Sequence, residues 1–115
     1  MLRGEIRLVH LDPVKRGEAA KTRPAVVVSN DVLNATTMSL QVGVVTVVPI
    51  TSNVAKIYPF QVKLGSAETG LRNDSKAQAE QIRAVAISRI GKRVGRLPAD
   101  LQEQLDIALR LHLDL

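Results

Sequence analysis

The chain has 115 residues, 45% of them hydrophobic and 23% charged, and this composition indicates one ordinary folded domain and excludes a disordered chain. Its 16 Lys and Arg residues outnumber 11 Asp and Glu residues, and the resulting net charge of +5 favours polyanionic partners, above all nucleic acid. There is no cysteine and there are only two histidines, His10 and His112, so we expect no disulfide, no metal site and no cofactor.

The first half of the chain has the pattern of strands separated by polar loops. Residues 5–11 alternate loosely and predict a strand, residues 14–22 predict a charged loop, and residues 25–29 predict a second strand. Asparagine and aspartate within residues 30–34 predict a turn region. No apolar run is long enough to span a membrane and no signal-peptide pattern opens the chain, which indicates a cytoplasmic protein without a membrane contact.

The second half contains one clear strand and one ambiguous segment. The β-branched run at residues 42–50 predicts a buried strand, and the alternation at residues 61–64 predicts another. Residues 76–90 are ambiguous, because their Ala and Gln content favours a helix whereas Ile82 and Val85 are also suited to a strand.

The C-terminal segment predicts an amphipathic helix. Pro98 suits its first helical position, and the apolar residues that follow recur at helical spacing on one face: Leu101, Leu105, Ala108 and Leu109. We therefore predict that residues 1–115 form a single, mostly β domain closed by one C-terminal helix.

Seven segments in this order resemble the MazF/PemK/Kid toxins of type II toxin–antitoxin systems. They are residues 3–6 (RGEI), 11–13 (LDP), 17–18 (GE), 23–29 (RPAVVVS), 48–52 (VPITS), 58–62 (YPFQV) and 79–83 (AEQIR). Because they span almost the whole chain, the resemblance is much more specific than any single motif.

The resemblance implies an SH3-like β-barrel with short helices that works as a homodimer. It also implies metal-independent, sequence-selective cleavage of single-stranded RNA, growth arrest, and inhibition by a cognate MazE-type antitoxin. For the ambiguous residues 76–90 it implies a strand up to about Val85, followed by a short turn of helix.

Three residues match family positions with catalytic or phosphate-binding roles: Glu18, Arg23 and Thr51. Arg23 can make two parallel hydrogen bonds to phosphate oxygens and stabilise the charge that grows in the transition state, although it also stands where a surface strand begins. Glu18 is expected either to be the general base or to orient Arg23. Thr51 can donate its hydroxyl to phosphate, although its residue type also suits the end of a strand.

Five further residues are expected to contact RNA: Lys21, Ser52, Lys56, Gln78 and Gln81. Ser52 shares the hydroxyl chemistry of its neighbour, Lys56 suits the RNA backbone, and the two glutamines can bind base edges. The remaining basic cluster at residues 92–96 is interpreted as a solvated face that adds at most electrostatic steering.

The general acid cannot be assigned from the sequence. Some relatives carry histidine where this chain has Thr22, and His10 and His112 are interpreted as structural or exposed. Two alternatives remain: a gyrase poison of the CcdB type, disfavoured because the chain lacks a terminal Trp, and a simple RNA-binding module, disfavoured because one Phe and one Tyr are too few for base stacking.

Overall fold

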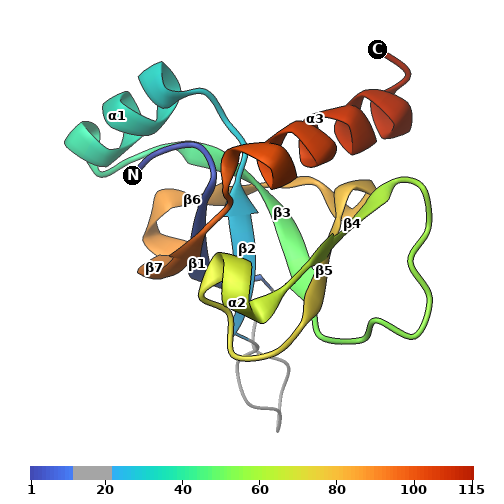
Figure 1. Ribbon diagram of the computed structural model, residues 1–115. Coiled ribbons are helices and arrows are strands. Elements are labelled where there is room, and N and C mark those ends of the chain that lie inside the picture. Colours follow the sequence, from blue (N-terminus) through green and yellow to red (C-terminus); the bar gives the residue numbers. More distant parts are fainter. Residues whose placement is uncertain (12–21) are drawn as a thin grey trace, which may run out of the picture.

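The computed structural model describes residues 1–11 and 22–115 (Figure 1). The strands are β1 (Glu5–His10), β2 (Thr22–Val27), β3 (Val44–Thr51), β4 (Gln61–Leu64), β5 (Ser75–Gln78), β6 (Arg83–Ala86) and β7 (Ile90–Arg96). The helices are α1 (Asp31–Leu40), α2 (Ser66–Thr69) and α3 (Ala99–Leu113), with 3-10 turns η1 (Ala79–Gln81) and η2 (Ile87–Arg89). The prediction of a mostly β chain with a C-terminal helix is confirmed.

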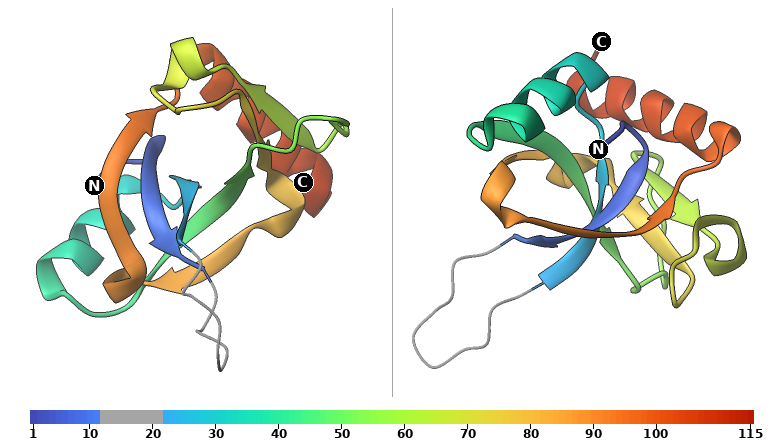
Figure 2. Two further views of the ribbon diagram at one scale, coloured as in Figure 1. Left: turned by 90° about the horizontal axis from the view of Figure 1, so that it is seen from below. Right: turned by 90° about the vertical axis from the view of Figure 1, so that its left-hand side faces the viewer.

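The seven strands form one antiparallel sheet in the order β4-β5-β3-β2-β1-β7, and β6 also pairs with β3. The sheet curves around its interior (Figure 2). Among the described strands no pairing joins its ends into a ring, so the structure supports the mostly β class and leaves the finer SH3-like barrel as an interpretation.

Strand β3 is the centre of this sheet. Its β-branched residues pair with β2 along one edge, and along the other edge with β6 through Val44–Val47 and with β5 through Ile50 and Thr51. β-branched side chains suit a pleated, buried surface, and the middle of β3 is fully buried. The predicted strands at residues 5–11, 25–29, 42–50 and 61–64 correspond to β1, β2, β3 and β4.

Helix α3 covers one side of the sheet, packed on β4 and η1. The four predicted apolar residues all face the core, and Leu105 is fully buried. Pro98 is the residue before the helix rather than its first residue. None of the described helices has the length and apolarity needed to cross a membrane.

The predicted turn at residues 30–34 is wrong, because α1 begins there. Asn30 caps the helix by accepting a hydrogen bond from the Leu33 N–H (2.8 Å), a role for which Asn is as well suited as for turns. Asn34 is buried inside the helix and donates to the Ser29 carbonyl (2.9 Å). Helix α1 is therefore fixed by a side chain that the sequence pattern assigned to a turn.

The ambiguous residues 76–90 are neither one helix nor one strand. Strands β5 and β6 are separated by η1, and η2 follows β6 directly. The family-based expectation of a short helical turn after about Val85 is therefore confirmed, whereas the expected single strand up to Val85 is interrupted by η1. Strand β7 was not predicted. It contains Gly95, where a β-carbon would collide with the Thr69 carbonyl. Close packing therefore requires glycine at a position where a strand pattern would have a larger residue.

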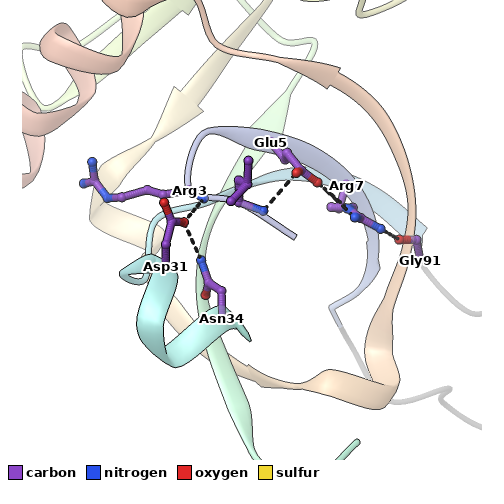
Figure 3. Close-up of polar contacts among 7 residues, drawn as sticks. Arg3, Glu5, Arg7, Asp31, Asn34 and Gly91 are labelled. Atoms are coloured by element: carbon purple, nitrogen blue, oxygen red, sulfur yellow. Dashed lines mark hydrogen bonds and ion pairs between the residues drawn. The ribbon is translucent and has the colours of Figure 1, made fainter. Parts of the chain in front are cut away.

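A buried carboxylate connects β1 to the edge strand β7 (Figure 3). Glu5 accepts from the Leu2 N–H (2.9 Å) and pairs with Arg7 (2.9 Å), and Arg7 donates to the Gly91 carbonyl (3.1 Å). Burial alone would raise the pKa of the Glu5 carboxyl, but these hydrogen bonds and the Arg7 charge outweigh it and hold that pKa below its ordinary value of 4.5.

We expect Glu5→Gln to lower the free energy of unfolding by about 1–2 kcal/mol at neutral pH, because Arg7 loses its charged partner. Since the folded pKa is lowered, the wild-type advantage is complete above about pH 4.5 and is lost as the pH falls through the folded pKa. Urea unfolding at a series of pH values measures this difference, with the exposed Glu103→Gln as control. An advantage that grew on acidification would contradict the assignment.

Candidate active-site groove

Arg23 and Thr51 lie at adjacent ends of β2 and β3. The antiparallel pairing of the two strands runs as far as Ala25 opposite Pro49, two residues short of Arg23 and Thr51. Both residues line one hollow of about 320 Å³, which we call the candidate groove. Its other lining residues come from the ends of the same strands and from the segment before β5: Pro24, Ile50, Ser52, Leu71, Arg72, Asn73 and Ser75.

A second hollow of about 260 Å³ also has Arg23 in its wall, so Arg23 stands between the two. Gln78 and Gln81 line this second hollow, together with Leu11, Pro49 and Arg83. The structure thus brings the two glutamines that were expected to contact bases next to the arginine that was expected to hold the phosphate.

The charged side chains among the described lining residues of both hollows are all basic: Arg23, Arg72 and Arg83. Hydroxyl groups of Thr51, Ser52 and Ser75 lie in the same walls of the candidate groove. A surface that combines guanidinium groups with hydroxyl donors binds phosphate oxygens by charge-assisted hydrogen bonds.

The Thr51 hydroxyl is oriented by the chain that follows it. The Asn53 N–H donates to Thr51 Oγ1 (3.2 Å), so this oxygen already accepts one hydrogen bond. Its own proton is therefore available for an outside acceptor, such as a phosphate oxygen.

Lys56 lies in the loop between β3 and β4 and does not line either hollow. Its ammonium group lies over the Tyr58 ring, 4.8 Å from the centroid, and Tyr58 stacks on Phe60 with 5.4 Å between ring centroids. The buried Lys76 of β5 donates from Nζ to the Lys56 carbonyl (2.6 Å). The Lys56 backbone is thus attached to the sheet beside the candidate groove.

Two of the predicted site residues, Glu18 and Lys21, lie outside the described residues. His10 is exposed at the end of β1 and its Nδ1 lies 2.9 Å from the Thr22 hydroxyl, and His112 is exposed near the end of α3. Within the described ranges, no group of three or more His, Cys, Asp or Glu side chains is placed to hold a metal ion.

Sequence reasoning missed the segment before β5. Leu71 and Arg72 line the candidate groove, but neither belongs to a motif, and only the folded chain brings their loop over the ends of β2 and β3. Lys76 was seen only as the start of an ambiguous segment, since an isolated lysine in a sequence carries no sign that it is buried.

Comparison with known proteins agrees with this geometry. Residues 2–113 match the family described as PemK-like, MazF-like toxin of type II toxin–antitoxin system. The chain is 59% identical over 115 residues to the endoribonuclease MazF9 of Mycobacterium tuberculosis, covering 100% of this chain and 98% of that protein. It is 34% identical over 114 residues to the endoribonuclease MazF6 of the same species, covering 98% and 96%.

Among solved structures, the MazE–MazF complex of Deinococcus radiodurans (Form-II) superimposes with a TM-score of 0.80 at 26% identity, covering 100% of this chain and 96% of that one. The mostly β fold and these full-length matches point to the same family of proteins. The chain belongs to the PemK-like, MazF-like toxin family of type II toxin–antitoxin systems.

We expect Lys76→Met to loosen the loop between β3 and β4 without unfolding the sheet. Methionine keeps much of the length of the side chain, but the Lys56 carbonyl loses a charged donor. Amide hydrogen exchange of residues 53–58 should rise about tenfold. Lys63→Met, an exposed position on β4, is the control, and equal exchange in both variants would show that Lys76 does not hold the loop.

Proposed function

We propose that this chain is a toxin endoribonuclease that cuts single-stranded RNA without a metal ion. The observation that carries the proposal is the convergence of Arg23 and Thr51 on one groove whose described charged residues are basic. The full-length similarity to proteins named endoribonucleases favours cleavage over a gyrase poison or a simple RNA-binding module.

The proposed reaction is an internal displacement at one RNA phosphodiester. A base removes the proton of the 2′-hydroxyl, the 2′-oxygen forms a bond to phosphorus, and the bond from phosphorus to the 5′-oxygen breaks. The products are a 2′,3′-cyclic phosphate and, after the departing oxygen takes up a proton, a 5′-hydroxyl.

Arg23, Thr51 and Ser52 stabilise the charge that develops on the phosphate. The Arg23 guanidinium contacts the two non-bridging phosphate oxygens, and the Thr51 hydroxyl, whose oxygen accepts from the Asn53 N–H, donates a hydrogen bond to one of them. Ser52 adds a second hydroxyl donor in the same wall. Glu18 is proposed as the general base or as the group that orients Arg23.

The bases next to the scissile phosphate are proposed to enter the hollow lined by Gln78 and Gln81, whose amides can pair with base edges. Lys21 and Lys56 are proposed to contact the RNA backbone. Selectivity for a short RNA sequence then comes from the glutamines, and affinity from the cations.

We further propose that the chain works as a homodimer and that a MazE-type antitoxin inhibits it. The similarity to the MazF chain of the Deinococcus radiodurans MazE–MazF complex supports the choice of this partner. The curved antiparallel sheet supports classification of the fold as an SH3-like barrel. The proposed substrate, cellular RNA, sets the cytoplasm as the place of action.

Arg23→Ala should lower the cleavage rate of mixed single-stranded RNA in the presence of EDTA by about a hundredfold to a thousandfold. The loss comes from removal of transition-state charge stabilisation, and the fold should be intact because Arg23 is exposed. Arg110→Ala, an exposed position on α3, is the matched control. A rate equal to that of the control would refute the role of Arg23.

Expression of the chain alone should arrest bacterial growth, because cleavage depletes cellular RNA. Colony counts after induction measure the effect, and co-expression of a cognate MazE-type antitoxin should restore growth. The toxin assignment would be contradicted if cells that express the wild-type protein grew as well as cells that express equal amounts of Arg23→Ala.

A further inference from the structure

A third hollow adjoins the candidate groove at the loop before β5. Its volume is about 340 Å³, at the lower end of the range of about 300–1,000 Å³ that ligand sites occupy. We call it the flank hollow, and its lining residues are Leu8, Gly70, Leu71, Arg72, Lys92 and Val94. Leu71 and Arg72 line the candidate groove as well, so the two hollows share a wall.

The pairing of neighbouring strands also places the flank hollow next to the candidate groove. Leu8 of β1, in the flank hollow, is directly paired with Pro24 of β2, in the candidate groove. Lys92 lies on β7, the next strand beyond β1. Since neighbouring strands are about 4.8 Å apart, β2 and β7 are separated by roughly 10 Å, which about three stacked nucleotides cover.

Both charged residues of the flank hollow, Arg72 and Lys92, are basic and exposed. The apolar part of the lining is formed by Leu8, Leu71 and Val94. A nucleotide has the complementary properties, because a flat base can lie on apolar side chains while its phosphate contacts the cations.

The walls of the flank hollow are held firmly. The loop of residues 70–74 is fastened at one end by the Gly70 N–H bond to the Ser66 carbonyl (3.1 Å) and at the other by Asp74, which accepts from the Ser66 N–H (2.9 Å). Strand β7 is held next to Lys92 by the bond from Arg7 to the Gly91 carbonyl (3.1 Å). The two cations are therefore carried on held backbone, Arg72 on the loop and Lys92 on β7.

We infer that the flank hollow is a second nucleotide subsite, which binds the RNA strand beyond the phosphodiester held at Arg23. The strand runs from the hollow of Gln78 and Gln81, past Arg23, over the candidate groove and past Arg72 to Lys92. This inference rests on the proposed function for the identity of the strand, and it assigns Lys92 a specific phosphate contact in place of general steering.

Binding of uncleavable strands tests the subsite independently of catalysis. Labelled 2′-O-methyl oligoribonucleotides of mixed sequence and increasing length cannot supply the attacking 2′-hydroxyl, and fluorescence anisotropy measures their affinity. For the wild-type protein, affinity should rise with length until the strand reaches the flank hollow. Lys92→Gln should weaken binding of the long strands about fivefold. It should also reduce the slope of log affinity against log salt for these strands by about 0.7.

Arg110→Gln removes one positive charge from α3 and is the matched control. The inference is overturned if Lys92→Gln and Arg110→Gln weaken long strands equally, or if Lys92→Gln weakens short and long strands by the same factor. It is also overturned if Lys92→Gln impairs binding of an acidic antitoxin peptide while leaving RNA binding unchanged. Failure of the wild type to cut unmodified RNA would refute the proposed nuclease, whereas a length-dependent loss in Lys92→Gln would still support the subsite.

Discussion

The pairing of β3 with three other strands is the constraint on which the rest of the structure depends. Because β3 pairs with β2 on one edge and with β6 and β5 on the other, its C-terminal end is held between β2 and β5. That arrangement places Thr51 and Arg23 in the wall of one groove, together with the segment before β5. A shift of β2 against β3 by one residue would turn Arg23 to the other face and separate the two side chains.

The groove at this strand end is a concentration of positive charge on a chain that also carries 11 acidic residues. Several described acidic side chains are occupied elsewhere: Glu5 binds Arg7, and Asp106 pairs with Arg3 (2.8 Å), which joins the N-terminal segment to α3. Burial alone would raise the pKa of Asp106, but hydrogen bonds from Arg3 and Gln102 and the nearby Arg3 charge lower it below 3.8. These carboxylates thus stabilise the scaffold, whereas the charged residues that line the hollows are basic.

Much of the fold was predictable because its main strands are β-branched runs with a clear period, and because α3 repeats Leu at helical spacing. Helix α1 was missed since its Thr, Ser and Asn residues have weak helix propensity, and it is fixed instead by the Asn30 cap and by Asn34 bonding to Ser29. Strand β7 was missed because its two glycines and its charged residues interrupt the alternation of apolar and polar residues that marks a strand. Its pairing with β1 forms the strand nevertheless. Motifs singled out Arg23 and Thr51, which both line the candidate groove, whereas no motif pointed to Leu71 and Arg72, because only the tertiary structure brings their loop to the groove.

The chemistry of the cut ends tests the central claim most directly. Purified protein is incubated with a defined single-stranded RNA in EDTA, and mass spectrometry identifies the termini of the fragments. Attack by the neighbouring 2′-hydroxyl predicts a 2′,3′-cyclic phosphate on one fragment and a 5′-hydroxyl on the other. Fragments that carry a 5′-phosphate and a free 3′-hydroxyl would show that water or another nucleophile attacks instead, and would contradict the proposed mechanism.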